Sequence, residues 1–174
     1  MSNLKINNQE IKLVVGLGNQ GDRFKKNRHN VGFLVLDGWV GEFNFLENKK
    51  LNSLIFQSEG VVWAKPLGFI NSSGETIAKI LNFYHFLPEQ MLVIHDDLEL
   101  KSGDYRVSFE KSASGHNGVR DIIEKIGTKS FYRLRYGIGR PENTDFPVHD
   151  FVLGNLSEAE LDKISHFPKN LILV

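Results

Sequence analysis

Two residues of this 174-residue chain have the chemistry of an acid–base pair, His29 and Asp96. His29 lies in the polar segment NRHN, and Asp96 follows an apolar run at 91–94 that predicts a buried strand. A carboxylate that accepts a hydrogen bond from one imidazole nitrogen leaves the other nitrogen available as a general base. We therefore interpret His29 as a catalytic base and Asp96 as its partner. The alternative is an exposed or structural histidine, the ordinary role of a histidine without such a partner.

Three asparagines follow predicted strand or loop ends in glycine-rich sequence: Asn19, Asn71 and Asn117. Their amides would supply donors and acceptors that position an ester or amide and its developing oxyanion. Asparagine is also common in turns and at helix N-termini. Because all three are expected at the rim of one sheet, we favour substrate binding over turn formation.

Other kinds of chemistry are disfavoured. The chain has no cysteine, which excludes a thiol nucleophile, disulfides and cysteine-ligated zinc. No serine lies in a GxSxG elbow, so attack by an activated water is the remaining hydrolytic route. The run His95-Asp96-Asp97 with Glu99 resembles a metal site, but no HExxH spacing accompanies it, and a solvated turn is the simpler alternative. We expect neither a metal nor a cofactor.

The segment GLGNQG at 16–21 has the GxGxxG form of a dinucleotide-binding turn, and Asp37 stands at a plausible distance for a ribose contact. A dinucleotide-binding helix would begin at the third glycine with an apolar face. The next residues, DRFKKNRHN, are almost all polar. The sequence therefore disfavours a dinucleotide enzyme.

Alternating strands and helices must position these residues. Apolar or alternating runs predict strands at 11–15, 60–66, 91–94 and 132–140, and an extended segment at 105–109. Helical spacing predicts helices over 31–43, 72–87, 119–126 and 157–167, although FLVLD at 33–37 is also compatible with a strand. Two of these helices open with S-x-x-E sequences, Ser72 to Glu75 and Ser157 to Glu160, which predict capping boxes.

This order predicts an α/β fold, with one domain over residues 1–174 and a central, largely parallel sheet. The sequence contains no evident linker or internal repeat. Ligands of such sheets bind outside the carboxyl ends of strands. Asn19 and Asp96 are both expected just past such ends.

Composition is that of a globular protein, with 41% hydrophobic and 24% charged residues. The sequence has neither a membrane-spanning apolar run nor a signal-like N-terminus, which predicts a cytoplasmic protein without membrane association. The net charge is zero, but residues 101–140 carry nine basic and four acidic side chains. Such a basic block is typical of nucleic-acid binding, and an evenly solvated surface explains it equally well.

In order and spacing, six segments resemble the bacterial peptidyl-tRNA hydrolase family almost from end to end: VVGLGNQG, RHNVGF, KPLGFINSSG, VIHDDLEL, SGHNGVRDII and FYRLRYGIGRP. The resemblance implies an enzyme that cleaves the ester joining a peptide to the 3′-terminal ribose of tRNA. It also implies a monomer with a twisted, mixed, largely parallel sheet flanked by helices on both faces, no cofactor and no obligate protein partner.

The resemblance also implies roles for individual residues. His29 matches the family's proton acceptor, and Asp96 matches the carboxylate that holds its basic form. Asn19 matches the position that helps to separate N-blocked peptidyl-tRNA from free aminoacyl-tRNA, and Asn71 and Asn117 match substrate-binding amides.

Three further positions are implied to contact the substrate. Phe24 and Phe69 match positions that line the tRNA or peptide site, although relatives often have tyrosine where Phe24 stands. Arg135 falls where a basic residue helps to hold the acceptor-stem phosphates.

The sequence departs from the family pattern in several places. Gln20 replaces a proline, which should loosen the first turn, and Ile70 replaces a methionine. KSAS at 111–114 stands in place of a glycine-rich loop, and Ser108 in place of a phosphate-binding lysine, whose charge Arg106 or Lys111 would have to supply. The chain ends at Val174, before the last helix of most relatives.

The main rival is a non-catalytic RNA-binding protein on the same scaffold, like the plastid splicing-factor relatives of this family. RNA binding alone does not require His29, Asp96 and all three asparagines together. We therefore expect ester hydrolysis by a water that His29 activates.

Overall fold

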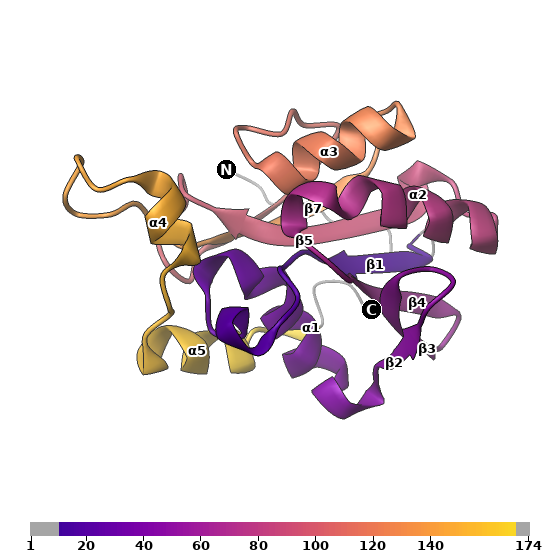
Figure 1. Ribbon diagram of the computed structural model, residues 1–174, viewed down its shortest axis with the longest axis horizontal. Helices are drawn as coiled ribbons and strands as arrows, with labels where there is room; N and C mark the ends of the chain where they lie inside the picture. Colours follow the sequence, from indigo (N-terminus) through magenta and orange to yellow (C-terminus); the bar gives the residue numbers. More distant parts are fainter. Residues whose placement is uncertain (1–10, 170–174) are drawn as a thin grey trace.

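The computed structural model describes residues 11–169 (Figure 1). Its strands are β1 (Leu13–Gly16), β2 (Leu46–Asn48), β3 (Ser53–Ser58), β4 (Val61–Pro66), β5 (Met91–Asp97), β6 (Tyr105–Phe109) and β7 (Tyr132–Gly137). Its α-helices are α1 (Val31–Val40), α2 (Ser73–Tyr84), α3 (Asn117–Ile126), α4 (Val148–Leu153) and α5 (Glu158–Ser165). Short 3-10 turns include η1 (Asp22–Phe24), η2 (Arg28–Asn30) and η4 (Ile70–Ser72).

The seven strands form one mixed sheet in the order β2-β3-β4-β1-β5-β7-β6. The central strands β4, β1, β5 and β7 pair in parallel. Antiparallel pairs add β3 and β2 at one edge and β6 at the other. The predicted mixed sheet is confirmed, and its parallel part is the centre.

Strands β1 and β5 lie in the middle of the sheet, where neighbouring strands and helices bury them. Every residue of β1 and β5 is buried, as expected for strands covered on both faces. Helices α1 and α5 cover one face of the sheet and α2 and α3 cover the other (Figure 1). The predicted helices on both faces are therefore confirmed. β5 continues to Asp97, so Asp96 lies inside the strand and not just after it as predicted.

The hairpin of β3 and β4 extends the sheet beyond the strands that the sequence predicted. Glu59 and Gly60 connect the two strands, and both have positive φ angles, 53° and 78°. Two successive positive φ angles make the tight two-residue turn whose twist suits a hairpin. Neither β2 nor β3 was predicted, because the polar segment 47–53 interrupts the apolar pattern. Helix α4 was not predicted either.

Helix ends depend on local backbone chemistry. α1 ends at Val40, short of the predicted residue 43, because Gly41 has a φ of 84°. The predicted capping box at Ser157 and Glu160 is present. The one predicted at Ser72 is wrong, since Glu75 instead accepts a hydrogen bond from Lys79 at 2.7 Å.

The ends of the predicted domain, residues 1–10 and 170–174, lie outside the described residues, and so does the expectation about the last helix. Among the helices of residues 11–169, none is long and apolar enough to cross a membrane.

Candidate active site

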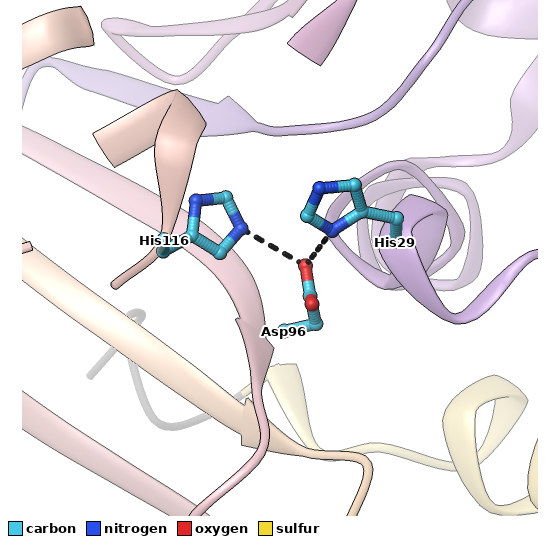
Figure 2. Close-up of side chains that lie close together, drawn as sticks. All are labelled: His29, Asp96 and His116. Atoms are coloured by element: carbon cyan, nitrogen blue, oxygen red, sulfur yellow. Dashed lines mark hydrogen bonds and ion pairs between the residues drawn. The ribbon is translucent and has the colours of Figure 1, made fainter. Parts of the chain in front are cut away.

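Asp96 accepts hydrogen bonds from two histidines through one carboxylate oxygen. Its Oδ1 lies 2.8 Å from His29 Nδ1 and 3.0 Å from His116 Nε2 (Figure 2). The carboxylate is 3% exposed, because β5 lies between β1 and β7. His29 belongs to η2, and His116 is the N-cap residue of α3. The structure thus brings the two predicted partners together and adds a third residue.

The approach of η2 to β5 depends on Gly32 in the first turn of α1. A Cβ atom on Gly32 would lie 2.4 Å from the Ile94 carbonyl oxygen and 2.4 Å from the Leu17 nitrogen. Only glycine lets the start of α1 pack directly on the backbone of the sheet. Because His29 precedes Gly32 by three residues, this packing brings His29 to Asp96.

Residues from the last part of the chain also hold η2. Arg28 donates to the Asn155 carbonyl oxygen at 2.7 Å and to the Glu160 carboxylate at 3.3 Å. Asn27 donates from Nδ2 to the Leu153 carbonyl oxygen. The turn that carries His29 is therefore fastened to the end of α4 and the start of α5.

Hydrogen bonds fix the tautomers of both histidines. His116 Nδ1 accepts from the Val119 backbone N–H at 3.2 Å, so its proton is on Nε2, which donates to Asp96. His29 donates to Asp96 from Nδ1. Its Nε2 is therefore unprotonated and has a lone pair that can accept a proton. A neutral imidazole with a free Nε2 is the form that a general base requires.

The charges of this cluster shift two pKa values. Burial alone would raise the pKa of Asp96, but the attraction and hydrogen bonds of His29 and His116 hold that pKa well below its ordinary value. Burial also disfavours the imidazolium form of His29, yet the Asp96 charge outweighs it and raises the pKa of His29. Asp96 thus stays ionised and stabilises a protonated His29.

Two cavities adjoin this cluster, and His29 lines both of them. The asparagine cavity, about 270 Å³, is lined by residues that include Asn19, Phe24, His29, Phe69, Asn71 and Asn117. The β5 cavity, about 370 Å³, is lined by residues that include Asp96, Asp97, Glu99, Gly115, His116 and Arg140. Six of the eight predicted site residues therefore surround one cavity, and Asp96 lines the other.

Asn19 is the most firmly held of the three asparagines. Its backbone N–H donates to Asn30 Oδ1 at 2.9 Å, and Asn30 Nδ2 donates back to its carbonyl oxygen at 2.9 Å. Asn19 Oδ1 accepts from the Ile70 N–H at 2.8 Å. Gln20 adds two hydrogen bonds to Gly68, so the loop after β1 is tied to the segment before η4 despite the missing proline.

Arg135 lines neither cavity. It lies on β7, and its Nε donates to Asp97 Oδ2 at 2.5 Å. Arg133, on the same face of β7, is 1% exposed, and two of its nitrogens have no partner among the described residues. Burial and the neighbouring charge of Arg135 lower the pKa of Arg133 to about 10. This face of the sheet is therefore rich in positive charge.

His116 is the residue that sequence reasoning missed. It stands directly before Asn117 and three residues before the helix predicted over 119–126. A histidine beside a predicted site asparagine was the available signal. Its contact with Asp96 depends on how α3 packs, which the local pattern does not specify.

His29, Asp96 and His116 could in principle supply three metal ligands, since their ligand atoms lie within 4.8 Å of one another. Both imidazoles, however, present an N–H and not a lone pair to Asp96. Binding through His116 Nε2 would move its proton to Nδ1 and break the hydrogen bond from Val119. The acidic run after His95 does not converge either, because Asp97 pairs with Arg135 and Glu99 pairs with Arg140.

The loop after β1 differs from a dinucleotide-binding turn. The 3-10 turn η1 follows the glycines where such a fold has a long helix. Asp37, the candidate for a ribose contact, pairs instead with the buried Lys65.

Comparison with known proteins agrees with this geometry. Residues 13–172 match the peptidyl-tRNA hydrolase family. A peptidyl-tRNA hydrolase of Aquifex aeolicus is 42% identical over 169 residues, covering 94% of this chain and 87% of the relative. One of Dichelobacter nodosus is 38% identical over 161 residues, covering 89% and 85%.

A solved structure leads to the same family. The crystal structure of peptidyl-tRNA hydrolase from Acinetobacter baumannii superposes with a TM-score of 0.79 at 31% identity, covering 94% of this chain and 84% of that one. With a family match over most of its length and relatives near 40% identity, this chain belongs to the peptidyl-tRNA hydrolase family.

Proposed function

We propose that this chain hydrolyses the ester bond of peptidyl-tRNA and releases the peptide and free tRNA, with His29 activating the attacking water. The observation that carries the proposal is the 2.8 Å hydrogen bond between His29 and Asp96 at the wall of the asparagine cavity. It leaves His29 Nε2 as a base beside side chains suited to hold an ester.

His29 Nε2 takes a proton from water as the water oxygen attacks the ester carbonyl. The imidazolium that forms lies against the ionised Asp96, whose charge stabilises it. His29 then returns the proton to the 3′-oxygen of the ribose as the ester bond breaks. Proton count and charge balance without a cofactor.

The asparagine amides are proposed to orient the acyl group. Asn19 uses Oδ1 for Ile70, which leaves its NH₂ group for the substrate. Asn117 Oδ1 accepts from Arg120 at 2.7 Å, so its NH₂ group is likewise left as a donor. Donors placed where negative charge develops lower the barrier of ester hydrolysis. Phe24 and Phe69 supply apolar surface on the same cavity, and Phe69 is 59% exposed.

The tRNA body is proposed to lie along β6 and β7, where Arg106 is exposed and Arg135 is partly exposed, while Arg133 on the same face is buried. Arg106 and Arg135 stand opposite each other in the strand register. Asp97 neutralises part of the Arg135 charge, so Arg106 contributes more of the phosphate attraction than sequence alone suggested. The protein is proposed to act as a cytoplasmic monomer.

The decisive experiment compares the chain with its His29→Ala variant on N-acetyl-aminoacyl-tRNA. Loss of a positioned general base lowers kcat/KM by about 10²- to 10⁴-fold. Activity near that of the unaltered chain in this variant would contradict the mechanism. If the unaltered chain bound tRNA but released no acyl group, the non-catalytic RNA-binding alternative would hold instead.

A further inference from the structure

The asparagine cavity and the β5 cavity share four lining residues: His29, Asn117, Val152 and His149. The first two already have proposed roles, and Val152 is a buried apolar residue of α4. His149 has none. It is an exposed residue in the first turn of α4, and its imidazole makes no hydrogen bond or ion pair within residues 11–169.

The two cavities differ in chemistry. The asparagine cavity adds apolar side chains, among them Phe69, Ile70 and Leu153, to its amides. The β5 cavity is lined by the charged residues Glu99 and Arg140 and by the loop at 113–115. An acyl group suits the first cavity, and a hydroxyl-rich nucleoside suits the second. The ester bond then lies between them, next to His29.

Helix α4 is held firmly enough for its first turn to present a side chain to this junction. The guanidinium of Arg28 lies 4.6 Å from the centre of the Phe151 ring, on the same helix as His149. Asn27 also bonds to the Leu153 carbonyl at the end of this helix. Both partners directly precede His29 in the sequence, so α4 keeps a fixed position relative to the base.

We propose that His149 binds the terminal ribose of the substrate through the hydroxyl next to the ester. An imidazole both donates and accepts, so it is suited to a ribose 2′-hydroxyl, which also donates and accepts. The inference rests on the proposed function and adds a residue that selects the alcohol half of the ester. His149 is a substrate-binding residue here and takes no part in proton transfer from water.

The experiment uses two substrates, N-acetyl-aminoacyl-tRNA that ends in adenosine and the same molecule that ends in 2′-deoxyadenosine. His149→Ala is expected to lower kcat/KM on the ribose substrate by about 2- to 10-fold, the effect of one hydrogen bond. On the deoxy substrate the variant and the unaltered chain should react equally fast, because the partner hydroxyl is absent. His149→Phe keeps a ring without the hydrogen bond and should match His149→Ala.

Asp150→Asn is the matched control, since Asp150 is exposed on the same helix and lines neither cavity. It should leave kcat/KM unchanged on both substrates. Equal losses for His149→Ala on both substrates, or full activity for His149→Phe, would overturn the ribose contact. If the unaltered chain hydrolysed neither substrate, the proposed function itself would fail, and that result is distinguishable from failure of the His149 inference.

Discussion

His29 and His116 donate to the same oxygen atom of Asp96, from 2.8 and 3.0 Å. The negative charge of Asp96 therefore interacts with the N–H groups of both histidines, and not with His29 alone. Because only His29 has a free Nε2, His116 acts by adjusting how strongly Asp96 attracts the proton of His29. The second histidine is thus a positioning residue for the first.

Removing the His116 donor should raise the pKa of His29. His116→Asn retains a good N-cap for α3 but removes the imidazole N–H from Asp96, whose charge then acts on His29 alone. The base works only when neutral, so activity is lost below its pKa. We expect the rising limb of the kcat/KM–pH profile to move to higher pH, with a plateau within about tenfold of the unaltered chain.

The control for that profile is His85→Asn. His85 caps α2 with a φ of 56°, which asparagine also tolerates. It contacts neither cavity and should leave the profile in place. A limb that moves to lower pH in His116→Asn would contradict the shared-charge account.

Asp96→Asn should lower kcat by about 10²- to 10⁴-fold and leave tRNA affinity nearly unchanged. The amide carries no charge to stabilise a protonated His29, and its NH₂ group can favour the wrong tautomer. Single-turnover hydrolysis and a separate binding titration distinguish the two effects. An equal loss of tRNA binding would indicate a structural role for the carboxylate.

Arg135→Ala should weaken tRNA binding and reduce the slope of log K against log salt by up to about one. Hydrolysis of a short acylated fragment should change little, because Arg135 lines neither cavity. Asp97 would lose its partner, so the double variant with Asp97→Asn separates lost phosphate contact from an unpaired buried charge. Lys79→Ala, which removes an exposed lysine of α2, is the control; equal tRNA affinity in both variants would place the phosphate contacts elsewhere.

Gly32→Ala should destabilise the fold by about 1–3 kcal/mol and lower activity as well. The new methyl group would meet the Ile94 carbonyl at 2.4 Å and push η2, with His29, away from Asp96. Gly38→Ala lies on the same helix, where the nearest atom to a Cβ among the described residues is 3.6 Å away. That control should be neutral or slightly stabilising in thermal unfolding. Equal melting temperatures for both variants would show that the close packing at Gly32 is unimportant.

The central strands could be predicted because β1 and the first four residues of β5 form apolar runs, which is what burial on both faces requires. The pairing of His29 with Asp96 could be proposed because each lies beside a recognisable element. Strands β2 and β3 could not, since both contain polar residues and β3 pairs with β4, which comes later in the chain. The best local signal for the hairpin of β3 and β4 was Glu59-Gly60, which is weaker than the Asn-Gly expected for such a turn.

Helix α4 and the role of His116 escaped prediction for a related reason. α4 has six residues with one buried side chain, so no helical period develops, and its position comes from contacts with Asn27 and Arg28. The alternation of residues around Arg135 correctly predicted strand β7. The ion pair between Arg135 and Asp97 could not be predicted, because Asp97 lies on a different strand. The position of α4, the role of His116 and the pairing of Arg135 all depend on contacts between residues far apart in the sequence.

The attachment of η2 to residues 153–160 means that the catalytic base can be held in place only late in the synthesis of this segment. His29 leaves the ribosome early, but the partners that fasten its turn, Leu153, Asn155 and Glu160, are translated more than a hundred residues later. A nascent chain that has already formed β1 and α1 lacks them. A ribosome-bound fragment is therefore expected to stay inert until translation has passed Glu160, because only then can every partner of the His29 turn be in place.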